Sequence, residues 1–241
     1  MRNIFREIED VLLPRPCPVC GKILPVSESG RGWIHRACYG RLTSVREPIC
    51  RKCGKPLSAE GRELCMDCSR NVRDYEYGRS LWCYDRFSGQ LIFSYKYGRQ
   101  QHLARDLSRC ACRSLGSWMQ SLHIDALVPV PVSHARMASR GFNQALLLAE
   151  EIGTALDIPV KEALVRSKKT LPQKELGKKQ RLKNLAGAFT ARPEMLTDVR
   201  RILLIDDIYT TGSTIELCTK ALKGAGAAKI WFFTLCIGGK D

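Results

Sequence analysis

The C-terminal third of the chain constrains the fold more than any other part of the sequence. A short apolar run at 201–205 is followed by two acids, a loop rich in Thr and Gly, a helical pattern at 213–223 and a second apolar run at 229–235. This strand, helix, strand order is typical of parallel strands joined by a crossover. Upstream, an apolar strand at 126–130 precedes an amphipathic helical pattern at 143–156. We therefore expect an α/β fold with a parallel sheet flanked by helices.

Two adjacent acids, Asp206 and Asp207, follow the apolar run at 201–205. Ligands of parallel α/β sheets bind at the carboxyl ends of the strands, and paired carboxylates can accept hydrogen bonds from the vicinal diol of a ribose ring. The next residues offer hydroxyls and unhindered amides at a helix N-terminus, where phosphates bind. These residues are Thr210, Thr211, Gly212, Ser213 and Thr214. A capping turn with incidental carboxylates is the alternative; the order of the residues favours a site for ribose and its 5-phosphate.

Four pairs of metal-ligating residue types occur in the N-terminal third, each with a two-residue gap. The pairs are Cys17 and Cys20, His35 and Cys38, Cys50 and Cys53, and Cys65 and Cys68. Both side chains of such a pair can reach one ion, so four pairs predict two tetrahedral sites for structural Zn²⁺. Disulfides are the alternative, but nothing in the sequence marks the chain as secreted. The pattern leaves open whether the pairs combine sequentially or as a cross-brace, and the spacing to Cys38 favours His35 as a ligand.

The formal net charge of +15 favours a polyanionic partner, either a phosphate-bearing ligand or nucleic acid. The excess of Lys and Arg is densest at 79–121. A basic surface that serves solubility is the alternative. No apolar run approaches the roughly 18 residues of a membrane span. We therefore expect a cytoplasmic protein with no membrane span.

The sequence VRRILLIDDIYTTGST at 199–214 resembles the motif with which type I phosphoribosyltransferases bind 5-phosphoribosyl-1-diphosphate (PRPP). Lys-Tyr-Gly at 96–98, Val-Pro-Val-Pro at 128–131 and Arg-Gly-Phe-Asn-Gln at 140–144 resemble the ComF competence-protein family. This resemblance implies a small double zinc-ribbon module joined to a type I phosphoribosyltransferase-like sheet. The expected domains are 1–76 for the zinc module and 77–241 for the phosphoribosyltransferase-like domain, with 77–121 as hood or connecting segment and 122–241 as core.

The resemblance also implies roles for several basic residues. The loop at 131–136 corresponds to the one that cradles pyrophosphate, so Arg136 and Arg140 are expected to neutralise the leaving group. The alternative for Arg140 is that it caps or pairs on the helix that begins near Phe142. The basic stretch between 166 and 183, which contains Lys169, is expected to close over bound PRPP. Mg²⁺ is expected to accompany PRPP, with few direct protein ligands.

The acceptor site is not recognisable in the sequence. Aromatic and basic residues alternate between 77 and 116, which suits single-stranded DNA, although Phe93 and Tyr97 at helical spacing are also typical of a core. Three functions stay open. In the first, the chain is a PRPP-binding competence factor that handles incoming single-stranded DNA beside a DNA translocase or recombination protein. In the second, it is an active phosphoribosyltransferase with an unknown acceptor. In the third, it is a PRPP-sensing regulator.

Overall fold

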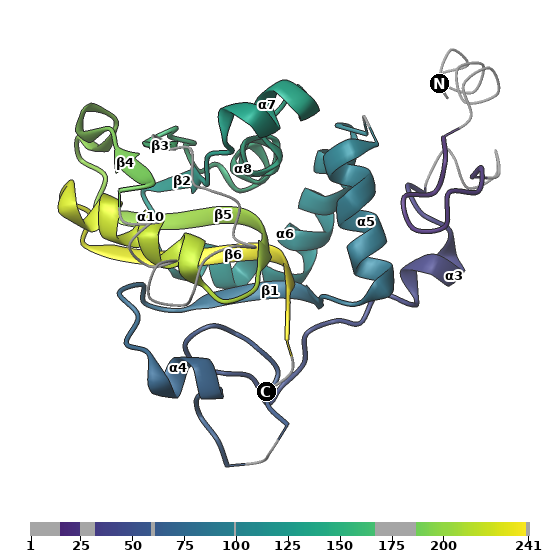
Figure 1. Ribbon diagram of the computed structural model, residues 1–241, viewed down its shortest axis with the longest axis horizontal. Helices are drawn as coiled ribbons and strands as arrows, with labels where there is room; N and C mark the ends of the chain where they lie inside the picture. The colour runs from purple at the N-terminus through teal and green to yellow at the C-terminus, as the bar shows by residue number, and fades with distance from the viewer. Residues whose placement is uncertain (1–14, 25–31, 59–60, 99, 167–186, 240–241) are drawn as a thin grey trace.

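A four-stranded parallel sheet forms the centre of the molecule (Figure 1). The computed structural model describes residues 15–24, 32–58, 61–98, 100–166 and 187–239. The strand order is β1 (Gly78–Cys83), β6 (Lys229–Ile237), β5 (Arg201–Tyr209), β2 (Ala126–Pro129), and each neighbouring pair runs parallel. The predicted α/β class is confirmed.

Strand β5 is longer than the sequence pattern predicted, because it continues through both acids. Asp206 still pairs with Thr234, and Tyr209 with Ile237. Alternate residues of a strand face opposite sides of the sheet, so Asp206 and Asp207 leave the sheet in opposite directions. The two acids are therefore held by strand geometry before the chain enters the loop.

Helices cover one face of the sheet, where α5 (Arg86–Tyr97), α6 (Leu103–Ser121) and α8 (Gln144–Leu156) pack. The sheet contributes Leu203, Phe233 and other fully buried side chains to this core. Helix α5 begins at a capping box, in which the Asp85 side chain accepts from the amides of Phe87 and Ser88. Between β2 and α8 lies the short helix α7 (His134–Arg140).

The opposite face of the sheet carries α10 (Ser213–Gly224) and the antiparallel strands β3 (Leu164–Arg166) and β4 (Phe189–Ala191). A 3₁₀ turn at Pro193–Leu196 follows β4. Ile215, Cys218 and Leu222 of α10 are buried against the even-numbered residues Ile202 and Leu204 of β5. The two faces thus use alternate side chains of the same strands, which explains why the strands read as continuous apolar runs.

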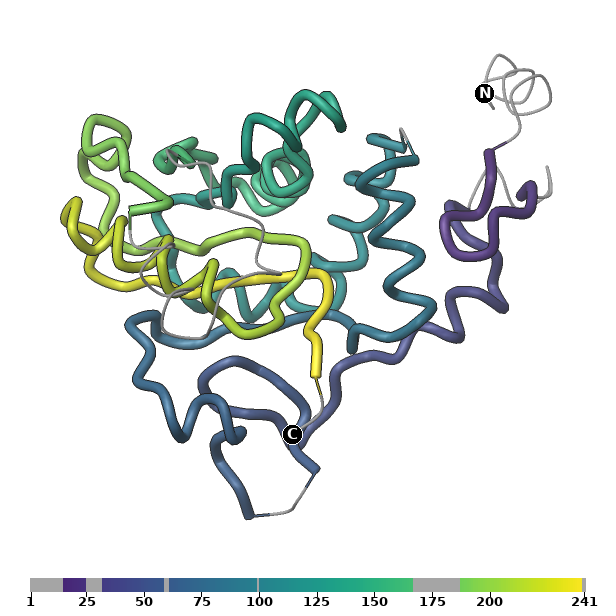
Figure 2. Tube along the Cα trace, in the orientation of Figure 1, coloured from purple at the N-terminus to yellow at the C-terminus, as the bar shows by residue number. Residues whose placement is uncertain are grey.

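The N-terminal cysteines lie in two separate places (Figure 2). The first cysteine group and helix α3 (Arg36–Tyr39) pack beside α5, where the Ser94 hydroxyl donates to the Pro18 carbonyl at 2.7 Å. The chain then runs along β1, pairing Val45 N–H with the Leu81 carbonyl. The second group and helix α4 (Met66–Arg70) join the core on the α10 face. No helix in the described part of the chain is long and apolar enough to cross a membrane.

The predicted hood segment is continuous with the central sheet. Its first strand, β1, is hydrogen-bonded to β6 from Gly78 to Cys83. Its helix α5 ends at Tyr97, close to the carboxyl end of β5. The segment therefore both completes the sheet and supplies side chains to the edge where ligands of such sheets bind.

Candidate functional site

The two acids at the end of β5 lie in different electrostatic surroundings. Asp206 accepts the Asp207 amide on its own Oδ1 at 2.8 Å, and Asp207 Oδ2 lies 2.6 Å from Lys96 Nζ on α5. Burial, followed by the charge of Asp207, raises the pKa of Asp206 from 3.8 to about 7. Asp207 is therefore paired with a cation, whereas the raised pKa of Asp206 places its protonation near neutral pH.

The loop between β5 and α10 approaches its own strand so closely that only glycine fits at its last position. Gly212 has φ +76°, and a Cβ atom there would collide with the Tyr209 hydroxyl. Because glycine has no side chain to cap α10, the first-turn N–H groups need another acceptor. Thr211 Oγ1 and Ser213 Oγ lie 3.0 Å apart and add hydroxyls at the same point. This arrangement of amides and hydroxyls at a helix N-terminus suits an anion.

The five predicted phosphate-binding residues, 210–214, lie at the loop and first turn of α10. The predicted basic residues Arg136 and Arg140 lie on a different element, α7. Arg136 is exposed on α7, and its charge partly offsets the rise in the pKa of Asp206 that burial and Asp207 cause. Arg140 donates to the Tyr97 hydroxyl at 2.7 Å and to Gln144 Oε1 at 2.8 Å, and its guanidinium lies 4.6 Å from the Tyr97 ring centre. Arg140 thus joins α7 to α5 and α8. Contact of either arginine with pyrophosphate stays a prediction.

Lys169 and most of the predicted basic loop fall within 167–186, outside the described residues. The role of Lys169 therefore stays a prediction. Lys96 was not among the site residues that the sequence predicted. It belongs to the Lys-Tyr-Gly sequence at 96–98, but only the packing of α5 against the sheet brings its ammonium group to Asp207.

The metal-ligating residues form two clusters that combine sequential pairs. Within each cluster, one ligand atom from every residue lies within 4.8 Å of the other three. The clusters are Cys17, Cys20, His35 and Cys38, and Cys50, Cys53, Cys65 and Cys68. The described residues therefore favour sequential pairing over a cross-brace.

The spacing of the ligand atoms fits a tetrahedral ion. Zinc–sulfur bonds of about 2.3 Å place two sulfurs of a tetrahedron about 3.8 Å apart. Cys53 Sγ and Cys65 Sγ lie 3.6 Å apart, and Cys20 Sγ lies 3.4 Å from His35 Nδ1. The other ring nitrogen of His35 lies 3.2 Å from the Ile23 carbonyl, so Nε2–H donates there and leaves Nδ1 free to bind metal. These residues fit structural Zn²⁺, whose binding would hold each knuckle together.

Comparison with known proteins agrees with both parts of the molecule. Residues 8–69 match the model of the double zinc ribbon domain, and residues 138–241 match that of the phosphoribosyl transferase domain. The chain is 32% identical over 210 residues to competence protein F of Haemophilus influenzae, covering 83% of this chain and 91% of that protein.

Two further relatives cover most of the chain. Identity is 29% over 206 residues with competence protein ComFC of Bacillus subtilis, covering 83% of this chain and 82% of that protein. It is 29% over 232 residues with DNA utilization protein YhgH of Escherichia coli, covering 93% and 97%. With a double zinc ribbon, a phosphoribosyltransferase domain and these relatives along most of its length, the chain belongs to the ComF competence-protein family.

Proposed function

We propose that this protein binds PRPP at the loop between β5 and α10. The proposal rests on three features that follow one another along β5 and the loop. They are two half-buried carboxyl groups, a position at which only glycine fits, and a helix N-terminus without a side-chain cap. The 5-phosphate would accept from the first-turn amides of α10. The ribose hydroxyls would donate to Asp206 and Asp207.

The charges around the site support a ligand that carries both anionic and diol groups. Lys96 neutralises Asp207, so a phosphate near this edge meets less repulsion than two free carboxylates would cause. The charge of Arg136, on the predicted pyrophosphate loop, partly offsets the rise in the pKa of Asp206 that burial and Asp207 cause. Mg²⁺, when bound with PRPP, would supply positive charge that offsets the negative charge of the pyrophosphate.

Calorimetric titration tests this proposal. Mg²⁺ and PRPP are titrated into the wild-type protein and into the double variant Asp206→Asn/Asp207→Asn. We expect binding to the wild type and at least a tenfold weaker affinity in the variant, because neutral amides are poorer acceptors for the ribose hydroxyls. An unchanged affinity in a folded variant would remove these two residues from the site.

The second part of the proposal is that the chain takes part in DNA utilisation by binding single-stranded DNA. Two of the relatives are named as competence proteins and one as a DNA utilization protein. On α5, Phe93 and Tyr97 are 57% and 49% exposed, so they are not the core residues that helical spacing alone would favour. Their ring centres lie 5.1 Å apart, and the Arg140 guanidinium covers Tyr97. Exposed rings beside cations suit stacked bases and a phosphate backbone.

The DNA proposal is tested by the dependence of affinity on salt. Contacts with several phosphates make the affinity for a single-stranded oligonucleotide fall steeply as salt is raised. The variant Phe93→Ser/Tyr97→Ser is expected to bind more weakly at every salt concentration with little change in slope, because it removes stacking and keeps the cations. A wild-type protein that does not bind at low salt would contradict the proposal.

Turnover of PRPP separates the remaining alternatives. Release of pyrophosphate in the presence of a nucleobase or an amine would identify an active phosphoribosyltransferase. Binding of PRPP without release across a broad panel of acceptors would favour a PRPP-sensing role. A DNA translocase or recombination protein as partner stays a prediction, which co-purification from cells during DNA uptake would test.

A further inference from the structure

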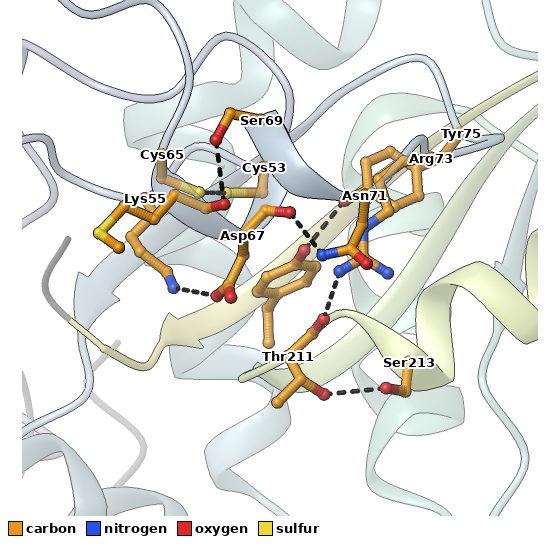
Figure 3. A network of polar contacts seen from close by, with 12 residues as sticks. Cys53, Lys55, Cys65, Asp67, Ser69, Asn71, Arg73, Tyr75, Thr211 and Ser213 are labelled. Carbon is orange, nitrogen blue, oxygen red and sulfur yellow. Dashed lines mark hydrogen bonds and ion pairs between the residues drawn. The ribbon is translucent and has the colours of Figure 1, made fainter. Parts of the chain in front are cut away.

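Three consecutive residues after the second metal cluster contact the end of β5, the loop that follows it and the first turn of α10. Figure 3 shows the contacts of Arg73 and Tyr75. Arg73 donates to the Thr211 carbonyl, the Asp74 amide donates to Glu216 Oε2 at 3.1 Å, and the Tyr75 hydroxyl pairs with that of Tyr209. The two sides of these contacts are more than 130 residues apart in the sequence. The metal module therefore touches the loop that the proposed function assigns to phosphate.

Arg73 donates a hydrogen bond to one peptide group of the loop. Its Nη2 lies 2.9 Å from the Thr211 carbonyl oxygen. In a trans peptide the carbonyl of one residue and the N–H of the next point in opposite directions. Holding the Thr211 carbonyl toward Arg73 thus aims the Gly212 N–H away from the metal module. A guanidinium on the carbonyl also polarises the peptide and makes that N–H a better donor.

Tyr75 contacts the residue that lies against Gly212, which is Tyr209. Its hydroxyl lies 2.9 Å from the Tyr209 hydroxyl, and both tyrosines are buried. Tyr209 stacks on Phe232, with ring centres 4.9 Å apart, and its hydroxyl occupies the space in which a side chain of residue 212 would lie. The backbone of the loop at Gly212 therefore packs against Tyr209, and the hydrogen bond from Tyr75 holds the Tyr209 side chain in this position.

The segment is itself fixed by the metal cluster. Helix α4 carries Cys68 and begins directly after Cys65. Asn71 Nδ2 donates to the Asp67 carbonyl at 2.8 Å, and Lys55 Nζ lies 3.0 Å from Asp67 Oδ2. An ion held by the four cysteines would give this short helix and the residues after it a defined position. Without the ion, a five-residue helix has few internal bonds to hold it.

We propose that Arg73 is a positioning residue for the phosphate loop and that metal bound at Cys50, Cys53, Cys65 and Cys68 keeps it in place. This inference rests on the proposed function, because it assigns a role at the same loop. It predicts that occupancy of the second metal cluster tunes the affinity for a 5-phosphate. The first cluster serves as an internal control, since its described contacts are with α5 and the helical face of the sheet.

The first experiment measures two ligands on one pair of variants. Arg73→Met removes the hydrogen bond and keeps much of the side-chain volume, and Arg70→Met removes an exposed arginine at the end of α4, just before the same segment. We expect ribose 5-phosphate to bind roughly tenfold more weakly to Arg73→Met, because the Gly212 N–H is no longer aimed and its hydrogen bond to the charged phosphate is weakened. Inorganic pyrophosphate is expected to bind equally to both variants. Equal loss for both ligands would indicate general damage and overturn the positioning role.

The second experiment changes the metal clusters one at a time. Cys53→Ser is expected to lower the zinc content by one ion and to weaken ribose 5-phosphate binding, whereas Cys20→Ser lowers the zinc content equally without changing that affinity. Equal effects of both changes would overturn the proposed link.

Hydrogen exchange separates this inference from the proposed function. We expect the amides of 210–214 to exchange faster in Arg73→Met and in Cys53→Ser than in the wild type, with no ligand present. If the wild-type protein binds neither PRPP nor ribose 5-phosphate, the proposed function fails, and faster exchange would still establish the link between metal and loop. Unchanged exchange in both variants would overturn the link whatever the ligand result.

Discussion

Replacing Asp206 by Asn should stabilise the folded protein at neutral and alkaline pH. Burial and the charge of Asp207 raise the pKa of Asp206 to about 7 in the folded state. A group whose pKa is higher when folded than when unfolded adds stability at low pH, and this contribution is lost as the pH rises through the folded value. The wild type therefore loses stability between about pH 4 and pH 7 through this group alone. Asn keeps the shape, and its Oδ1 can still accept the Asp207 amide.

The size of the effect follows from the two pKa values. At about 1.36 kcal/mol for each pH unit, the change from 3.8 to about 7 sets an upper bound of about 4 kcal/mol. Most of the gain in the free energy of unfolding of Asp206→Asn over the wild type should be present at pH 7, and about half of it at pH 5.5. Relaxation around the ionised carboxylate reduces the bound, so a stabilisation of about 2 kcal/mol at pH 8 is expected.

Urea unfolding of wild type and Asp206→Asn at pH 5.5, 7.0 and 8.5, at one fixed free zinc concentration, measures this difference. The stability gain should rise from pH 5.5 to pH 7.0 and then level off. The matched variant Asp207→Asn breaks the ion pair with Lys96, so it should show no comparable gain. An Asp206→Asn protein that is less stable than the wild type at pH 8.5, or a gain that does not change with pH, would refute the assigned cause of the pKa shift.

Three further predictions concern the loop, the metal and the exposed rings. Gly212→Ala should destabilise the fold by about 1–3 kcal/mol and weaken PRPP binding, because residue 212 has positive φ and faces the Tyr209 hydroxyl; an unchanged thermal midpoint would contradict this. Native mass spectrometry should find two zinc ions per chain, and removal by a chelator should lower the thermal midpoint; a protein that carries none after purification without chelator would refute the metal assignment. Tyr97→Leu should weaken single-stranded DNA binding and release the Arg140 side chain. Arg140→Lys should retain only part of the DNA affinity, because lysine stacks poorly on a ring. Wild-type DNA affinity in both variants would exclude this surface.

Local patterns were sufficient to predict the fold class and to single out the loop at 210–214 that we propose binds phosphate. Continuous apolar runs separated by helical patterns require a parallel sheet covered on both faces, and the structure confirms this. The loop at 210–214 was recognisable because its residues are contiguous. The four ligand pairs were recognisable for the same reason, since each pair lies within a single turn.

Contacts between distant segments could not be read from such patterns. The approach of Lys96 to Asp207 depends on how α5 packs beside the sheet, and the contact of Arg73 with Thr211 joins residues 138 apart. The combination of cysteine pairs into clusters depends on the path of the chain between them. Strand β5 also continues past Ile205, because backbone pairing with β6 outweighs the low strand preference of two acids.

Amide chemical shifts of the loop test the central claim most directly. PRPP with Mg²⁺ is titrated into ¹⁵N-labelled protein while the amides of Gly212, Ser213 and Thr214 are followed. The account predicts saturable shifts of these amides with PRPP and with ribose 5-phosphate, and no such shifts with pyrophosphate alone. Loop amides that do not respond at a PRPP concentration saturating the protein would contradict the assignment of the phosphate to the start of α10.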